Sequence, residues 1–151
     1  MGRLVRVLVA VTSMLTALLA VPSPSLAGGG GSAAVDAAFI DRLLYQTSLT
    51  SFVRTATNRI GPDGVAGDSW FDWSTDGCSA PLVGSTGRSF DFTAACRRHD
   101  FGYRNTKLLD QRYGRGTSWN RWSRAAIDNQ FLVDMKAHCR ERAWYDRPTC
   151  N

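Results

Sequence analysis

The side chains best suited to chemistry are one histidine and three aspartates between residues 76 and 128. His99 and Asp100 are adjacent, Asp128 lies on the next predicted helix, and Asp76 stands shortly before a cysteine. An imidazole can take a proton from water near neutral pH, and a carboxylate against its second nitrogen stabilises the charged ring. Clusters of oxygen ligands suit Ca²⁺. These residue types therefore indicate a histidine base beside an oxygen-ligated metal ion.

The spacing predicts that His99 and Asp128 face one another. Each recurs at helical spacing with mostly apolar neighbours, His99 with Phe92, Cys96 and Tyr103, and Asp128 with Ala125, Leu132, Met135 and Cys139. We therefore expect both residues on buried stripes, where an ionised carboxylate needs a partner. In the alternative interpretation, Asp128 pairs with Arg124 one turn earlier and His99 is an ordinary core histidine.

Two further residues bear on this pair. Gly102 costs its helix about 1 kcal/mol relative to alanine, which suggests that another backbone, such as that of the Asp128 helix, approaches closely there. His138, the only other histidine, is expected to be structural. Asp134 lies one turn before it, and the C-terminus of the helix favours its charged form.

The composition divides the chain into three parts. Residues 1–27 have the pattern of an export signal, with Arg3 and Arg6, a mostly apolar run up to Ala20, and small residues ending at Ala27. The run is shorter than the roughly 20 residues that span a bilayer, which disfavours an uncleaved anchor. Residues 28–33 are predicted to be a flexible leader, and residues 34–151 to form one domain.

Four cysteines remain in this domain, and in an exported chain they are expected to form two disulfides. The sequence permits three pairings. Local pairing of Cys78 with Cys96 and of Cys139 with Cys150 is favoured, because short loops close easily. A structural zinc site is disfavoured, since the chain has neither a CxxC motif nor a close pair of histidines.

The first of these disulfides would help to assemble a metal site. It would tether Asp76 and Gly77 about one helical turn from Asp100, and so bring two carboxylates and free backbone carbonyls together. Ca²⁺ accepts about six to eight oxygen ligands and tolerates irregular loops. The alternative is that Asp100 pairs with Arg97 or Arg104, at helical spacing on either side.

The elements that position these residues are predicted to be helices. Apolar spacing predicts helices over 34–46, 49–60, 92–109 and 119–140, capped by Thr47 or Ser48, by Asp91, and by Thr117 or Ser118. A glycine-containing loop over 61–89 carries Trp70, Phe71 and Trp73; we expect two of them to pack under the loop and the third to reach a lipid surface. The predicted fold is all-α: a small disulfide-bonded helical domain with two long antiparallel helices and a calcium-binding loop.

The charge of the domain is mildly positive. Without Arg3 and Arg6, 16 basic side chains face 13 acidic ones, so the mature domain carries about +3. This excess suits an anionic lipid surface, but it is too diffuse for nucleic acid, which usually requires a dense basic stripe. We expect no nucleic-acid partner and a monomer.

Three stretches of the chain resemble the bacterial and fungal secreted phospholipase A2 family. They are Phe71-Asp-Trp-Ser-Thr-Asp76-Gly77-Cys78, Phe92-Thr-Ala-Ala-Cys96-Arg-Arg-His99-Asp100-Phe-Gly-Tyr103-Arg-Asn105 and Ala126-Ile-Asp128-Asn-Gln-Phe131. The match covers most of residues 70–139, and C-x-x-H-D-x-x-Y after an acidic, cysteine-containing loop is its most specific part. The chain departs from the family where members often have a bulkier residue than Gly77 and further helix beyond the last cysteine, here Cys150.

The resemblance implies a secreted, calcium-dependent enzyme that hydrolyses the sn-2 ester of phospholipids in a membrane surface or micelle. By carry-over, His99 is the general base, Asp128 orients its ring, and Asp76, Gly77 and Asp100 hold Ca²⁺. No covalent enzyme intermediate is implied, because water is the attacking group.

The role of Tyr103, one turn after His99, is left open between a hydrogen bond within this network and core packing. Two rival functions also remain open. One is a catalytically silent phospholipase-like domain that binds lipid or protein, and the other is a cationic membrane-disrupting protein, which would not need His99.

Overall fold

The structure is a computed structural model of the 151-residue chain, and it describes residues 31–60, 70–78, 86, 90–114 and 116–150. The predicted signal sequence over 1–27, half of the leader and most of the 61–89 loop lie outside the described residues. The described helices are α1 (Ala33–Asp41), the π-helical η1 (Arg42–Gln46), α2 (Leu49–Arg59), α3 (Thr93–Tyr113), α4 (Arg121–Glu141) and α5 (Arg147–Cys150). An isolated bridge pairs Thr86 with Asp91, and the elements formed by the described residues are otherwise all helices. The predicted all-α fold is confirmed.

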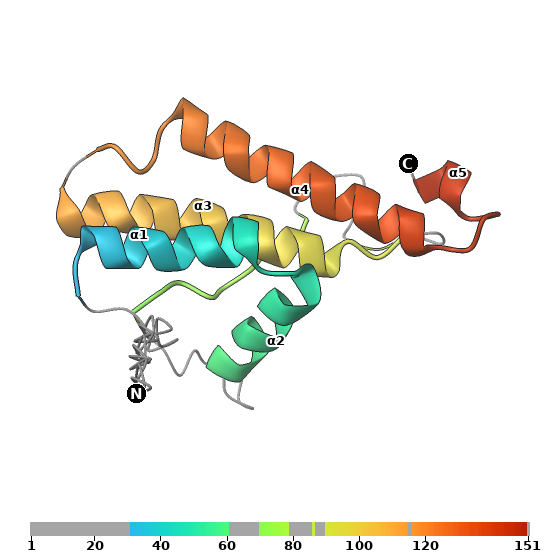
Figure 1. Cartoon of the computed structure of the whole chain (residues 1–151), viewed down its shortest axis with the longest axis horizontal. Coiled ribbons are helices and arrows are strands. Elements are labelled where there is room, and N and C mark those ends of the chain that lie inside the picture. Colours follow the sequence, from blue (N-terminus) through green and yellow to red (C-terminus); the bar gives the residue numbers. More distant parts are fainter. Residues whose placement is uncertain (1–30, 61–69, 79–85, 87–89, 115, 151) are drawn as a thin grey trace, which may run out of the picture.

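Helices α3 and α4 form a long antiparallel pair, as expected (Figure 1). Helix α1 lies along the other side of α3, and α2 packs against α3 near its N-terminal half, where the chain turns away from the pair. Because α3 contacts each of the other long helices, it is the central element of the domain.

The helix ends differ in detail from the predicted ones. Ser48 caps α2 as expected, with its Oγ accepting the Ser51 N–H at 3.2 Å. Helix α3 continues beyond residue 109 to Tyr113, and it stops at Gly114 in the left-handed conformation (φ 63°). The predicted cap Asp91 is wrong by one residue: Phe92 occupies the cap position, although Asp91 Oδ1 still accepts the Thr93 N–H.

The N-terminus of α4 was also misplaced. The expected caps were Thr117 or Ser118, whereas the cap is Asn120, whose Oδ1 accepts the backbone N–H groups of Trp122 and Ser123. Ser123 Oγ accepts the Asn120 N–H in return, which completes a capping box. Asparagine is as good a cap as serine or threonine, so the misplaced start reflects a choice among adjacent capping residues.

The core is built around stacked aromatic rings. Phe71 and Trp73 are each 2% exposed and pack against Phe39 and Phe101. Two of the three loop aromatics are therefore buried, as expected. The third, Trp70, is partly buried with its Nε1 donating to Asp36 at 2.7 Å, and its contact with a lipid surface stays a prediction.

Both predicted disulfides are present, Cys78–Cys96 with a Cα–Cα distance of 5.3 Å and Cys139–Cys150 with 5.5 Å. The first joins the segment before residue 79 to α3, and the second joins the end of α4 to α5. Among the described residues, no helix combines the length and hydrophobicity needed to cross a membrane.

Candidate active site

The side chains of His99 and Asp128 meet across the α3–α4 interface. His99 Nε2 lies 2.8 Å from Asp128 Oδ1, and the Tyr103 hydroxyl donates to the same oxygen at 2.8 Å. An ionised carboxylate can only accept, so Nε2 carries the proton and Nδ1 is left as the basic nitrogen. The structure therefore holds the imidazole in the tautomer that can take a proton from water.

Two aromatic rings hold the imidazole in place. The His99 ring centroid lies 4.4 Å from that of Tyr103 and 4.9 Å from that of Phe131. Burial, followed by the hydrogen bond to Asp128, raises the pKa of Tyr103. The phenol therefore stays protonated and keeps donating to Asp128 throughout the neutral range.

The stripes expected to be buried on the two helices are buried only in part. Cys96 and Cys139 are each 2% exposed, and the predicted contact is present. The side chain of Asp128 is 55% exposed and that of His99 is 23% exposed. Leu132, on the Asp128 stripe, is 44% exposed. The faces that are buried instead include Phe101 on α3 and Ile127 on α4. Both predicted stripes therefore flank the helix interface, where they border a cleft.

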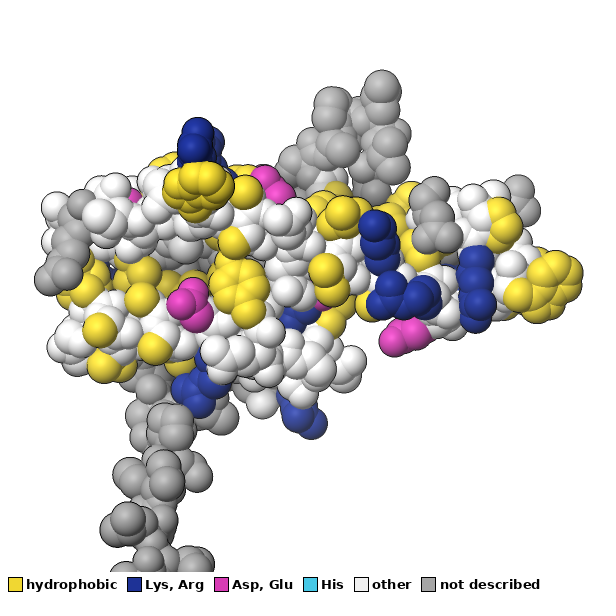
Figure 2. All heavy atoms as spheres, turned by 45° about the horizontal axis from the view of Figure 1, so that its top comes forward, with side chains coloured by type: hydrophobic (Ala, Val, Ile, Leu, Met, Phe, Trp, Pro, Cys, Tyr) yellow, Lys and Arg dark blue, Asp and Glu magenta, His cyan; other side chains and the backbone are white. Residues whose placement is uncertain are grey.

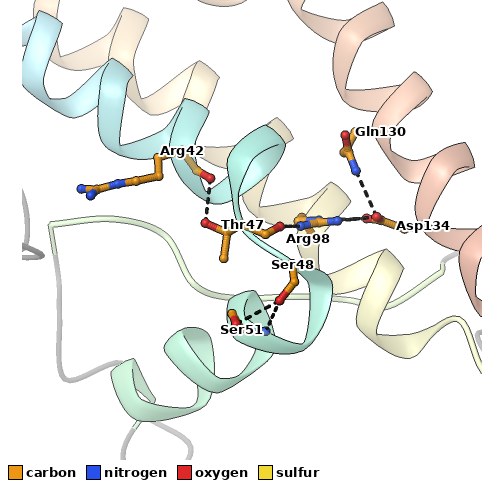
Figure 3. Close-up of polar contacts among 7 residues, drawn as sticks. All are labelled: Arg42, Thr47, Ser48, Ser51, Arg98, Gln130 and Asp134. Carbon is orange, nitrogen blue, oxygen red and sulfur yellow. Dashed lines mark hydrogen bonds and ion pairs between the residues drawn. The ribbon is translucent and has the colours of Figure 1, made fainter.

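A buried ion pair locks α3 to α4 beside this site (Figure 3). Two guanidinium nitrogens of Arg98 donate to Asp134, Nε to Oδ2 at 2.8 Å and Nη2 to Oδ1, and the two side chains are 4% and 5% exposed. The remaining Arg98 nitrogen donates to the Thr47 carbonyl at 2.6 Å, and the Gln130 amide donates to Asp134 at 3.0 Å. Because Arg98 directly precedes His99, we infer that this ion pair fixes the position of the imidazole along α4.

Gly102 allows the two helices to approach closely. A Cβ at Gly102 would lie 3.0 Å from Ile127 Cγ2 on α4 and 3.0 Å from Leu44 Cδ2 on η1. The expected close approach of the Asp128 helix is present, although side chains rather than backbone make the contact. A larger residue at this position would push α4 away from His99.

His138 is placed differently from the prediction. Asp134 pairs with Arg98 instead, and His138 Nε2 accepts the Asp91 N–H at 3.1 Å. The imidazole thus ties the start of α3 to the end of α4. Its contacts are structural, but their partner is not the predicted one.

The acidic loop over residues 70–78 is attached to α3 at two points. Asn105, fully buried on α3, donates to the Asp72 carbonyl at 2.8 Å and accepts the Asp72 N–H at 2.9 Å. The Cys78–Cys96 disulfide is the second attachment. Sequence reasoning missed Asn105, although a polar residue on the buried face of a helix signals such a partner.

The loop brings its carboxylate beside the one on α3. Asp100 Oδ2 accepts from the Thr75 hydroxyl at 2.5 Å and from the Asp76 N–H at 3.2 Å. Asp76 Oδ1 lies 3.0 Å from a guanidinium nitrogen of Arg104, so Arg104 pairs with Asp76 and not with Asp100. Arg97 reaches the Thr57 hydroxyl. The expected alternative partners of Asp100 are therefore engaged elsewhere.

A cavity of about 310 Å³ joins the imidazole to the acidic loop; its lining consists of Asp76, Gly77, Cys78, Cys96, His99, Asp100 and Phe131. Burial, and the negative charge of Asp76 in addition, raise the pKa of Asp100, while the Thr75 hydroxyl opposes them. Two carboxylates thus share one partly dehydrated space.

The donors around this cavity suit a hard cation. No group of three or more His, Cys, Asp or Glu side chains that could hold a metal occurs among the described residues. A cation here would be held by the Asp76 and Asp100 carboxylates, with backbone carbonyls and water completing its shell. Ca²⁺ accepts such mixed oxygen ligands, so the residues present fit it.

Known proteins with similar sequences agree with this picture. A sequence model of prokaryotic phospholipase A2 matches residues 40–151. A "Secretory phospholipase A2" of Arthroderma benhamiae is 34% identical over 128 residues, which cover 83% of this chain and 76% of the relative. A "Secretory phospholipase A2" of Beauveria bassiana is 36% identical over 99 residues, which cover 66% of this chain and 44% of the relative.

Proposed function

The chain belongs to the prokaryotic phospholipase A2 family and is a phospholipid-hydrolysing enzyme, and from this we propose that it cleaves the sn-2 ester with Ca²⁺ bound beside His99. The observation that carries the proposal is the 2.8 Å contact between His99 Nε2 and Asp128, at a cavity that two further aspartates line. This arrangement supplies a base for water and a site for a cation within one cavity.

In the proposed reaction, His99 Nδ1 takes a proton from water as the water oxygen attacks the ester carbonyl carbon. Asp128 holds the Nε2 proton and stabilises the imidazolium that forms, and Tyr103 shares the charge on Asp128. His99 then gives its proton to the departing glycerol oxygen. The oxygen of the water ends in the free fatty acid, and the proton taken up by His99 ends on the lysophospholipid. The enzyme thereby returns to its starting state.

Asp76, Asp100 and the Gly77 carbonyl are the proposed cation ligands. Bound Ca²⁺ supplies the positive charge that polarises the ester carbonyl and attracts the substrate phosphate. The raised pKa of Asp100, caused by burial and by Asp76, supports this assignment, because a cation would relieve both effects. Arg104 presents little obstacle, since exposed ion pairs contribute roughly 0–1 kcal/mol.

We also propose that residues 1–27 direct export, that residues 34–151 form the secreted enzyme, and that it acts as a monomer. The printed names of both relatives, which call them secretory, support export. Sequencing the N-terminus of protein recovered from culture medium tests the cleavage after Ala27, and an intact residue 1 there would contradict it.

The experiment that tests the reaction uses phosphatidylcholine vesicles labelled in the sn-2 acyl chain. Fatty acid release by the purified protein should require Ca²⁺, and it should stop in His99→Ala. His138→Ala, which changes the other histidine, should stay active and serves as the matched control. Release that persists in excess chelator would refute the calcium mechanism.

The same vesicles separate the two rival functions when protein binding and release of entrapped contents are measured as well. A catalytically silent domain would bind vesicles without releasing fatty acid. A membrane-disrupting protein would release vesicle contents with full potency in His99→Ala.

A further inference from the structure

The connection between α4 and α5 exposes two large aromatic side chains. Trp144 is 79% exposed and Tyr145 is 65% exposed, and their ring centroids lie 5.7 Å apart in an edge-to-face arrangement. Large aromatics are usually mostly buried, so a neighbouring pair in water calls for an explanation. We call these two side chains the aromatic tip.

The aromatic tip is held by a covalently closed segment. The Cys139–Cys150 disulfide joins the two ends of the segment, 11 residues apart. Within it, the Arg147 side chain donates to the Arg142 carbonyl at 3.0 Å, and the Asp146 N–H donates to the Ala143 carbonyl at 2.9 Å. The rings are therefore presented by an ordered loop, which lowers the entropy lost when they bind a surface.

Basic side chains lie near the tip in the sequence, and we call Lys136, Arg140 and Arg147 its basic rim. From residue 136 to residue 150 there are four of them against two acidic ones, and Lys136, Arg140 and Arg147 are exposed. Figure 2 shows Lys and Arg side chains grouped beside projecting hydrophobic ones at the end of the molecule that α5 occupies in Figure 1. Aromatic rings within a cationic rim match the headgroup region of an anionic bilayer, because indole and phenol favour that depth and basic residues attract anionic lipids.

A mostly apolar cavity lies on α4, at positions between Asp128 and the tip in the sequence. A shallow cavity of about 230 Å³ is lined by Phe92, Leu132, Met135, Lys136, Cys139 and Cys150. Leu132 directly follows Phe131, which lines the cavity containing His99. Both cavities are therefore lined in part by α4, the helix that ends just before the tip.

We propose that the aromatic tip and its basic rim are the surface with which this enzyme docks on anionic phospholipid membranes. The inference rests on the proposed function, since it assumes a lipid substrate, but it concerns attachment and not chemistry. The rings would enter the headgroup region, and Lys136, Arg140 and Arg147 would lie against lipid phosphates.

Trp122 provides a matched control on the same helix. It is 70% exposed, near the opposite end of α4 from the tip. The guanidinium of Arg121 lies 4.3 Å above its ring, so one face of the indole already has a partner. Removing Trp122 deletes the same exposed side chain type without touching the proposed surface.

The test measures sedimentation with vesicles of equal parts phosphatidylglycerol and phosphatidylcholine, in a His99→Ala background that leaves the lipid intact. Adding Trp144→Ala and Tyr145→Ala should weaken binding roughly tenfold or more, whereas Trp122→Ala should leave it unchanged. Vesicles of phosphatidylcholine alone should bind more weakly. Equal binding by the tip variant, or an equal loss in Trp122→Ala, would overturn the proposal.

Two further measurements separate attachment from chemistry and from misfolding. With His99 intact, the tip variant should lose vesicle hydrolysis in step with binding, yet turn over a soluble short-chain phospholipid at the wild-type rate. Trp144→Phe keeps an aromatic ring and should bind normally, but it should lose most of the fluorescence quenching by brominated lipids. Unchanged quenching in Trp144→Phe would refute insertion of the tip, whether or not the protein hydrolyses lipid.

Discussion

Removing one partner of the buried Arg98–Asp134 pair should cost far more stability than replacing both. Asp134→Ala leaves a guanidinium that is 4% exposed with the Thr47 carbonyl as its remaining acceptor. Breaking a buried ion pair from one side costs about 3–5 kcal/mol. Domains of this kind are stable by about 5–15 kcal/mol, so the single variant loses a large part of its free energy of unfolding.

The double variant Arg98→Met with Asp134→Leu should recover most of that loss. Both charges disappear, and apolar side chains fill a comparable volume, which is often close to neutral for stability. Urea unfolding of the wild type, both single variants and the double variant gives the coupling energy directly. If the loss of unfolding free energy in the double variant equals the sum of the losses in the two single variants, the two charges act independently. That result would refute the reasoning.

The stable double variant should nevertheless turn over substrate more slowly. Arg98 precedes His99 on α3, so the directional ion pair fixes the position of the imidazole relative to α4. Apolar contacts in its place would let α3 slide along α4. A displacement on the order of 1 Å can reduce turnover by up to about a hundredfold. Wild-type kcat on a soluble substrate would show that packing alone aligns the site.

Three further outcomes are expected. Gly102→Ala should lower the free energy of unfolding in urea by about 1–3 kcal/mol, because its Cβ would press on Ile127 from 3.0 Å. Tyr103→Phe removes a hydrogen bond to Asp128 and should lower kcat roughly two- to tenfold in steady-state assays. Burial alone would raise the pKa of Asp110, but backbone N–H donors outweigh it and lower that pKa. Asp110 therefore stabilises the fold above the unfolded-state pKa of about 3.9, and the contribution disappears as the pH falls through the lower folded-state pKa. In urea titrations, Asp110→Asn should have a lower free energy of unfolding than wild type at neutral pH. The two proteins should have equal stability at a pH below the folded-state pKa of Asp110.

The helices, both disulfides and the His99–Asp128 contact were predictable from the sequence, but the argument for the contact identified the wrong faces. A polar residue on an apolar stripe does need a partner. The residues that meet this condition are Arg98 and Asp134, which stand on the faces shared with Phe101 and Ile127. His99 and Asp128 lie beside these faces, at 23% and 55% side-chain exposure.

The acidic loop was harder to predict in detail. Its attachment by Cys78 follows from cysteine spacing, but the choice of Asp76 as partner for Arg104 depends on where the loop backbone turns. Helical spacing offered Asp100 as the natural partner of Arg104. A tertiary contact between segments far apart in sequence replaced that local one, and local spacing carries no information about it.

Helix α3 gathers the parts of the site into ten consecutive positions, from the cysteine that anchors the loop at 96, through His99 and Asp100, to Asn105. These residues belong to one helix, so rigid-body motion of α3 moves them together and leaves the distances between them unchanged. The distance that such motion can change is the one across the α3–α4 interface, where Asp128 and Phe131 of α4 reach the imidazole. On gradual warming, the rate of hydrolysis should therefore fall as the α3–α4 packing loosens. Circular dichroism should still report intact helices at that temperature.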